Sequence, residues 1–447
     1  MSVTSRQKAL DLKADQVHQH IVSGFLEDKK LAVIKAPPGS GKTFMLLRIL
    51  ASLVEANWRV AIATQTNTQA EDLIRQLSEH GVLKKYKIAR LGSSGSVAPD
   101  GFPEKASWVH DPHEIDDGPG VAVSTAAKWA SLRENPGFDL FAIDEAWQMK
   151  WADMMRCSSV SDRYLLIGDP GQIPPVTSVD TARWGTSHRP PHKAVPEVAL
   201  EEFFEEAMTD ELPAVRRLPN ASVEYVKPFY DFDFEAYAEP DDRAVSFGLL
   251  AEDSFSKVIL GFSSFEPQLL TVPTPEDGPP IETDAEVASA IKKLIDRMLT
   301  SQLEISLNPG QAARLITQSD IGVSATHRAM LGMIRKTLGT ELPQIRVDTP
   351  ERWQGLQMPF MIAVHPLSSA LNPSDFDLQT GRLCVMASRH QIGLVLVSRD
   401  HIFETLADTV TFATQAPGQP DETGRGRAAH DALLSLLTER NRVVAIS

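Results

Sequence analysis

One strand–loop–helix segment near the N-terminus constrains the fold more than any other part of the sequence. The apolar run LAVIK (31–35) is typical of a buried strand, and TFMLLRILASLVEA (43–56) has the length and apolar periodicity of a helix. The octamer between them, Ala36-Pro-Pro-Gly-Ser-Gly-Lys-Thr43, is rich in glycine and opens the helix. Backbone N–H groups of such a loop, together with a helix N-terminus, can surround a polyphosphate. The segment therefore predicts a phosphate-binding loop, formed by Gly39, Ser40, Gly41, Lys42 and Thr43.

Further apolar runs predict that this loop lies at the edge of a parallel sheet. RVAIAT (59–64), GVAVST (120–125), LFAID (140–144) and YLLIGD (164–169) are short, mostly uncharged and separated by helical stretches, one of them near 69–77. Such alternation is typical of domains in which helices cover both faces of a parallel sheet. We therefore predict an α/β fold with parallel sheets flanked by helices.

A second alternating set follows residue 300. ARLITQ (313–318), QIRVD (344–348), PFMIAVHP (359–366) and IGLVLVS (392–398) are strand candidates, and 325–338 is a helix candidate. The other expected elements are helices at 198–208 and 283–299, loops at 92–118 and 266–280, a linker at 414–427 and a last helix at 428–439.

Length and composition limit the class of protein. A chain of 447 residues is long enough for two or three domains. We place the first domain at 1–176, a hinge at 177–210, a second domain at 211–404, and a C-terminal linker and helix at 405–447. The net charge of −15 disfavours a protein that coats nucleic acid or anionic membranes without specificity. Two cysteines, no apolar signal segment and no apolar run long enough to span a membrane predict a cytoplasmic protein.

An acidic pair follows the strand candidate FDLFAID, which ends in Asp144 and is followed by Glu145. The carboxyl ends of parallel strands share one edge of a sheet, so we expect this pair to lie beside the phosphate loop. There Lys42 would pair with the β- and γ-phosphates, Thr43 and Asp144 would hold Mg²⁺, and Glu145 would act as general base on the attacking water. These motifs predict a nucleoside triphosphatase. They do not distinguish kinases, switches and motors.

Several further segments, in this order, resemble the superfamily 1 helicases, in particular their Upf-type and RecD-type branch. They are ATQTNTQAEDL (63–73), GDPGQIPP (168–175), LPAVRRLP (212–219), IGVSATHRAM (321–330), VDTPERWQGLQ (347–357) and RLCVMASRH (382–390). The resemblance covers most of the chain, and it implies two RecA-like domains that bind ATP and Mg²⁺ between them.

The resemblance also implies roles for single residues in nucleotide binding. Gln16 is similar to the glutamine with which this family reads adenine, although a surface glutamine would look the same in the sequence. Gln172 would sense the γ-phosphate. Arg217 and Arg389 would reach that phosphate from the second domain, Arg389 as an arginine finger. Gln354 and Gly355 match the family motif that couples the bound nucleotide to the nucleic-acid strand.

Other residues would contact nucleic acid. Thr66 and Asn67 occupy a strand-to-helix turn that suits phosphate contact, although an N-capped helix start explains them equally well. Thr326 or His327 would lie near the nucleic-acid strand in the second domain. Trp353 is expected in the core, whereas Trp147 could be core or a platform on which a base stacks.

The sequence departs from the family pattern at two positions. Arg216 replaces the aromatic residue that usually precedes the phosphate-contacting arginine, so the choice between Arg216 and Arg217 stays open. Gln357 replaces a glutamate, which could weaken the coupling between ATP and the strand.

These inferences predict an ATP-dependent helicase or translocase that moves along a single strand and unwinds duplex. DNA is the preferred substrate, and the resemblance implies 5′→3′ travel. A protein partner could help to load the acidic chain, and no membrane partner is expected. The alternatives are an ATPase that remodels complexes without unwinding, and a nucleotide-gated switch or small-molecule kinase.

Overall fold

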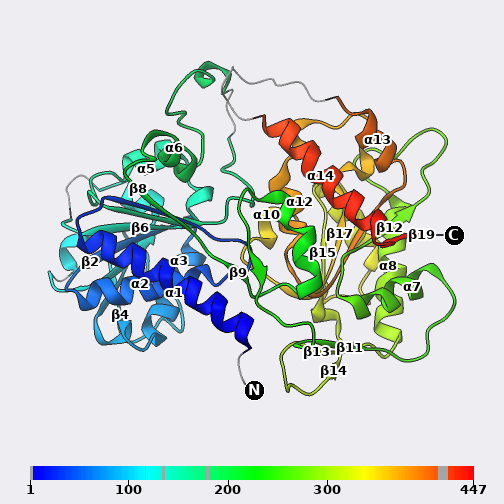
Figure 1. Cartoon of the computed structure of the whole chain (residues 1–447), viewed down its shortest axis with the longest axis horizontal. Helices are drawn as coiled ribbons and strands as arrows, with labels where there is room; N and C mark the ends of the chain where they lie inside the picture. The colour runs from blue at the N-terminus through cyan, green and yellow to red at the C-terminus, as the bar shows by residue number, and fades with distance from the viewer. Residues whose placement is uncertain (1–3, 116, 133–135, 178–180, 411–420, 447) are drawn as a thin grey trace. The chain divides into compact units, whose positions relative to one another are not determined.

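Two parallel β-sheets organise the chain, each in a unit of its own (Figure 1). The computed structural model describes residues 4–115, 117–132, 136–177, 181–410 and 421–446. Within these ranges the phosphate-loop unit comprises residues up to 170 and 174–213, and the C-terminal unit comprises 171–173 and the residues from 214 onward. The predicted α/β fold, with parallel sheets flanked by helices, is confirmed.

The phosphate-loop unit is built on an eight-stranded sheet with the order β4-β3-β5-β2-β6-β7-β1-β8. Every pairing in this sheet is parallel. Its strands are β1 Leu31–Lys35, β2 Arg59–Thr64, β3 Lys87–Leu91, β4 Ala106–Val109, β5 Gly120–Thr125, β6 Leu140–Asp144, β7 Tyr164–Gly168 and β8 Ala207–Glu211. Its helices are α1 Ser5–Leu26, α2 Lys42–Glu55, α3 Asn67–Glu79, α4 Ala126–Trp129, α5 Trp151–Arg156 and α6 Val195–Glu202.

Alternating side chains of these strands pack into two separate cores, one on each face of the sheet. Ala32 and Ile34 of β1 belong to the cluster that contains the buried residues of α1, α2 and α3. Val33, between them, belongs to the other cluster, with Trp129 of α4 and Trp151 of α5. Successive side chains of a strand point to opposite faces, so an uninterrupted apolar run is what a sheet covered on both sides requires.

The C-terminal unit is built on a six-stranded parallel sheet with the order β16-β15-β17-β18-β12-β19. These strands are β12 Gln268–Val272, β15 Ile321–Ser324, β16 Arg346–Asp348, β17 Met358–Val364, β18 His390–Arg399 and β19 Val443–Ala445. Shorter strands form two small sheets: β9 Ala214–Val215, β10 Glu235–Ala236, β11 Ala244–Ser246, β13 Glu304–Ser306 and β14 Arg314–Leu315. The helices are α7 Ser254–Gly261, α8 Ala285–Thr300, α9 Arg328–Leu338, α10 Pro350–Trp353, α11 Asp375–Leu378, α12 Thr380–Ala387, α13 Ile402–Asp408 and α14 Glu422–Glu439.

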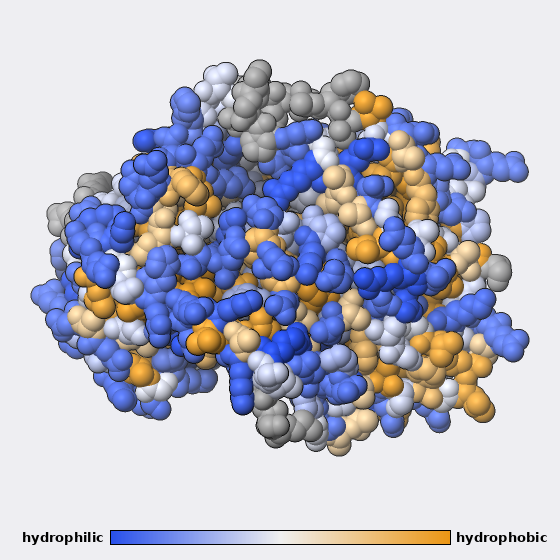
Figure 2. Space-filling model, in the orientation of Figure 1, coloured by the Kyte–Doolittle hydropathy of each residue, from blue (hydrophilic) through white to orange (hydrophobic). Residues whose placement is uncertain are grey.

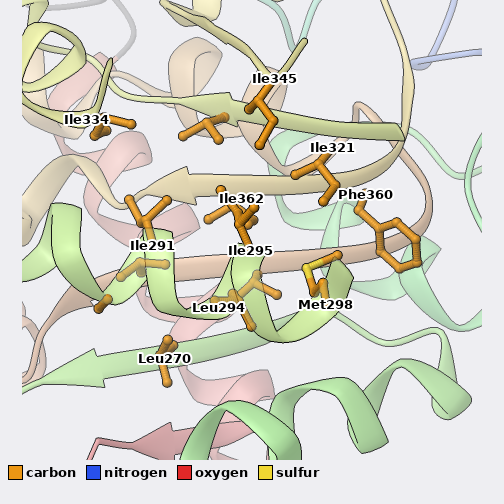
Figure 3. Close-up of a cluster of buried hydrophobic side chains, with 14 of the residues drawn as sticks. Leu270, Ile291, Leu294, Ile295, Met298, Ile321, Ile334, Ile345, Phe360 and Ile362 are labelled. Carbon is orange, nitrogen blue, oxygen red and sulfur yellow. The ribbon is translucent and has the colours of Figure 1, made fainter. Parts of the chain in front are cut away.

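The core on one face of this second sheet is centred on helix α8. Ile291, Leu294, Ile295 and Met298 recur at helical spacing and meet strand residues such as Ile362 (Figure 3). An apolar stripe of this period buries one side of a helix against a sheet. The opposite face is covered by the buried residues of α12, α13 and α14.

Two predicted elements differ from the observed ones. ARLITQ (313–318) does not enter the parallel sheet: it contributes β14, which is exposed and antiparallel to β13, and the parallel strand is β15, three residues beyond the segment. The predicted helix 198–208 is helix α6 followed by strand β8, which pairs with β1. Met208 lies in that strand and packs against Gly24 of α1, so tertiary contacts override the local helical pattern.

Segments expected to be loops also contain strands. Residues 266–280 include β12, which is fully buried between β18 and β19 although Pro267 and Pro273 flank it. Residues 92–118 include β4, at one edge of the first sheet. Helix α14 begins at Glu422, inside the predicted linker 414–427; residues 411–420 lie outside the described part of the chain.

The observed units have different limits from the predicted domains. Most of the expected hinge, 177–210, belongs to the phosphate-loop unit, because α6 packs in its core and β8 extends its sheet. The described part of 405–447 belongs to the C-terminal unit through α14 and β19. The face drawn in Figure 2 carries mostly hydrophilic residues, interspersed with hydrophobic ones. Among the described residues, the helices are all too short or too polar to cross a membrane.

Candidate functional site

The phosphate loop connects β1 to α2 in a conformation that its glycines make possible. Gly39 has φ 69° and Gly41, the N-cap of α2, has φ 87°. Side chains with a Cβ rarely adopt this left-handed region, which explains why glycine occupies both positions. The Ala36 N–H donates to the Gly168 carbonyl at 2.8 Å and ties the loop to strand β7. Ser40 is buried within the turn.

Lys42 meets both carboxylates of the acidic strand end. Its Nζ lies 3.0 Å from Asp144 Oδ1 and also contacts Glu145 Oε1. The three side chains are each less than one-fifth exposed. Burial alone would lower the pKa of Lys42, but the two carboxylates outweigh it and raise the pKa above its ordinary value. The structure thus brings together the amine and the carboxylates that were predicted to share one site.

The backbone at Glu145 is strained. Strand β6 ends at Asp144, and Glu145 follows with φ 55°, in the left-handed region. Its N–H donates to Asp144 Oδ1 at 3.0 Å. A residue with a side chain pays about 1–2 kcal/mol to adopt this conformation, and such strain gathers at functional sites. The kink turns Glu145 back toward Lys42 instead of continuing the strand.

The predicted contacts to Mg²⁺ and adenine fall on α2 and α1. Thr43 is the second residue of α2 and is half-buried. Gln16 is exposed near the middle of α1. The two helices are tied together by Arg48 Nη2, which donates to Asp15 Oδ1 at 2.7 Å, next to Gln16 in the chain. The adenine contact itself stays a prediction.

The predicted nucleic-acid turn at Thr66 and Asn67 is a capped helix start. Thr66 is the N-cap of α3, and its Oγ1 accepts from the Gln69 N–H at 3.2 Å. Asn67 is exposed, and its Oδ1 accepts from Arg90 Nη2 at 2.8 Å. Arg90 was missed in the sequence analysis. It is 2% exposed within β3, where burial lowers its pKa, and a charged residue in so apolar a strand was the available signal.

The segment around Gln172 leaves the first unit and packs within the second. A Cβ at Gly171 would lie 2.4 Å from Tyr230 Cζ, and one at Gly381 would lie 2.7 Å from the Gln172 carbonyl oxygen. Ile173 is buried in the core that contains α12 and α14. Asp169 and Pro170, just before this segment, belong to the phosphate-loop unit. The predicted γ-phosphate sensor therefore lies on a covalent connection between the two units.

Arg217 and Arg389 lie in one part of the C-terminal unit. Arg217 Nε donates to Gln357 Oε1 at 3.1 Å, and its Nη1 donates to the carbonyl of Ser388, the residue before Arg389, at 3.2 Å. Arg389 is 1% exposed, and its Nε and Nη2 lack a hydrogen-bond partner among the described residues. Arg216 instead covers the ring of Tyr237, with Cζ 3.7 Å from the ring centroid. This geometry favours Arg217 over Arg216.

The remaining predicted residues lie at the ends of α10 and β15. Gln354 follows Trp353 at the end of α10, and Gly355 has φ 78°. Thr326 is half-buried just after β15. Trp353 is fully buried and Trp147 is 5% exposed, so both belong to cores.

Comparisons with known proteins agree with these motifs. Residues 11–220 match the family model described as an AAA domain. The DNA replication ATP-dependent helicase/nuclease DNA2 of Saccharomyces cerevisiae is 26% identical over 163 residues, which cover 34% of this chain and 10% of that protein. The DNA polymerase alpha-associated DNA helicase A of Schizosaccharomyces pombe is 32% identical over 71 residues, which cover 16% of this chain and 10% of that protein.

The chain matches several further curated relatives, and its matches cover between 8% and 18% of the length of each relative. Among solved structures, the PRRSV helicase aligns with a TM-score of 0.42 and 15% identity, over 83% of this chain and 52% of that one. The complex of Arterivirus nonstructural protein 10 (helicase) with DNA aligns with a TM-score of 0.43 and 14% identity, over 86% of this chain and 63% of that one.

Proposed function

Because the chain belongs to the superfamily 1 helicases, we propose that it hydrolyses ATP to move along a single strand of nucleic acid and to unwind duplex. The family rests on the motif order and on the AAA domain match. Membership in the Upf-type and RecD-type branch, and with it 5′→3′ travel, stays a prediction.

The phosphate-loop unit supplies groups suited to ATP hydrolysis. Lys42 would bind the β- and γ-phosphates, and Thr43 and Asp144 would hold Mg²⁺. A Mg²⁺ ion held by Thr43 and Asp144 would supply positive charge that neutralises the phosphate oxygens. Glu145 would accept a proton from the attacking water. The strained turn that brings Glu145 to Lys42 supports this assignment, because it places a carboxylate beside the phosphate-binding amine.

One observation carries the proposal beyond a generic ATPase. Arg217 and Arg389 are far apart in the sequence, yet Arg217 binds the carbonyl next to Arg389. Buried guanidinium nitrogens without a partner within the described structure are costly, and an anion such as a γ-phosphate would satisfy them. A second unit that carries both Arg217 and the buried Arg389 suits a motor, in which hydrolysis depends on how the units approach each other.

The single strand of nucleic acid would run over the starts of helices and the ends of β-strands. The hydroxyl of Thr66, the amide of Asn67 and the hydroxyl of Thr326 suit phosphate contacts, which carry no information on sequence. The curated relatives are named as DNA helicases, and this supports DNA as the substrate. The net charge of −15 supports a protein partner that helps to load the motor.

The test measures ATP turnover with and without single-stranded DNA and RNA. We expect single-stranded DNA to stimulate turnover, Glu145→Gln to lower it about 10²–10⁴-fold and Arg389→Ala to lower it about 10³-fold or more. Glu205→Gln and Arg156→Ala, both exposed and outside the site, are matched controls. ATP turnover that neither single-stranded DNA nor single-stranded RNA stimulates would support the switch or kinase alternative. Full activity of Arg389→Ala would refute its assignment as an arginine finger.

A second candidate is an ATPase that translocates or remodels complexes without unwinding. It is favoured because neither of the two longest segments between the motifs forms a separate wedge that could split a duplex. Strand β4 adds residues 106–109 to the first sheet, and β11, α7 and β12 add 244–272 to the C-terminal unit. Each segment is thus part of its unit rather than a separate wedge. A strand-displacement assay separates the two candidates.

A further inference from the structure

We propose that Phe376, Arg382 and His327 form a platform on which a base of the single strand stacks. The inference rests on the proposed function and adds a binding site to it. Phe376 lies in α11 and is 42% exposed, whereas Trp353 at the end of α10 is buried. An exposed ring that is fixed by its neighbours requires an explanation.

Two planar groups from other segments meet this ring. Arg382 Cζ, from α12, lies 3.8 Å from the centroid of the Phe376 ring. The His327 ring lies 5.7 Å away, tilted by 36°. Arg382 is held in place, because its Nε donates to Glu351 Oε1 at 3.0 Å and its Nη1 contacts Gln379. The cluster is therefore ordered before any ligand arrives, which reduces the entropic cost of binding.

The platform lies where the second unit is expected to contact the strand. His327 follows β15 as the N-cap of α9, and Glu351 lies in α10, just after β16. Strands β15 and β16 are adjacent and parallel, so both residues lie at the same edge of the sheet. A small pocket at this edge is lined by Thr326, His327, Ser368 and Ser369, among others. Hydroxyl groups of this kind suit the phosphate–sugar backbone.

The chemistry of the cluster points to a base of a single strand. Aromatic rings and guanidinium planes stack on bases regardless of sequence, because every base has a π-face. The bases of a duplex already stack on one another, so a protruding ring engages an unpaired strand more easily. Trp147 and Trp353, the tryptophans nearest to the motifs in the sequence, are buried and do not offer such a face. Phe376 takes the role that the sequence analysis had considered for Trp147.

The experiment measures binding of the full chain to a fluorescent oligo-dT strand, and to the same strand with abasic sites. We expect Phe376→Ala to weaken binding to oligo-dT about 5- to 100-fold, the range that one stacked base contributes. The difference from the wild type should disappear on the abasic strand. Leu260→Ala removes an apolar side chain of the same unit that is 57% exposed on α7, and it should bind as the wild type does.

A second variant keeps the inference testable if Phe376→Ala folds poorly. Phe376→Trp should restore affinity, and its added tryptophan emission should be quenched by oligo-dT and not by the abasic strand. Equal affinity of Phe376→Ala and wild type, or an equal loss on both strands, would overturn the platform while leaving the motor intact. A wild-type protein that binds neither strand would overturn the proposed function and the platform together.

Discussion

Among the buried histidines of the C-terminal unit, His390 and His430 link its stability to pH. Burial lowers the pKa of His390 to about 3, with help from the nearby charges of Arg243 and Arg217. Burial likewise lowers the pKa of His430 to about 4. His390 Nε2 donates to Ser222 Oγ at 2.8 Å, because Ser222 itself donates to the Phe265 carbonyl. Both rings are therefore neutral in the folded protein.

The sign of the pH effect follows from these lowered values. An unfolded histidine titrates near pH 6.5, so below that pH the unfolded chain binds protons that the folded chain does not. We expect the free energy of unfolding to be constant above about pH 6.5 and to fall as the pH drops toward 4. Urea unfolding at pH 7.5 and 5.0 measures this loss. His430→Leu should reduce it and His188→Asn, which removes an exposed ring, should not; an unchanged loss in His430→Leu would contradict the assignment.

At the scale of elements, two glycines show how differently a strand end and a helix interior tolerate a methyl group. A Cβ at Gly168, which ends β7, would lie 2.9 Å from the Ala146 N and 3.0 Å from Trp147 Cε3. Ala146 directly follows the strained Glu145. Gly332, inside α9, has no atom within 4 Å of the same position.

These contacts predict opposite effects of the same substitution. Gly168→Ala should destabilise the protein by about 1–3 kcal/mol, because the η3 turn (Ala146–Gln148) must shift, and ATP turnover should fall because Glu145 moves with it. Gly332→Ala should stabilise the protein by about 0.4–1 kcal/mol, since alanine restricts the unfolded chain. Thermal unfolding of the two variants measures the change in stability, and ATP turnover measures the change in activity. A Gly168→Ala variant as stable and active as the wild type would contradict the prediction, because it would show that the turn shifts without cost.

At the scale of the whole molecule, the groups that we propose for ATP hydrolysis are divided between two units. Lys42 and Glu145 belong to the first unit, and Arg217 and Arg389 belong to the second. Gln172 lies on one of the covalent connections between them. Turnover should therefore depend on residues that make no contribution to the phosphate loop itself.

The two adjacent arginines of the second unit provide a paired test of this dependence. Arg217→Ala should lower strand-stimulated turnover by about 10²-fold or more, because Arg217 lies beside the Arg389 backbone. Arg216→Ala removes the contact with the Tyr237 ring and should lower turnover less than about tenfold. Steady-state turnover at saturating DNA measures both. The opposite order would assign the γ-phosphate contact to Arg216.

Much of the site could be predicted because its parts are local. The phosphate loop, Asp144 with Glu145, and the strands on either side are each encoded by consecutive residues. Short, uninterrupted apolar runs identified β1, β2, β5, β6 and β7 to within about a residue, since strands buried on both faces need no alternation of polar and apolar residues. Strands β8, β12 and β19 were not predicted, because pairing with distant strands stabilises them more than their own sequence does.

The sequence by itself determined the chemistry: which residues can bind phosphate, carry Mg²⁺ or donate a proton, and in which order they occur. Only the tertiary structure decided which of them meet. It placed Arg217 against Ser388 and Gln357, turned Arg216 onto Tyr237, buried Trp147 and left Phe376 exposed between Arg382 and His327. These outcomes depend on contacts between residues up to 171 positions apart, and no local pattern in a sequence records such distant contacts.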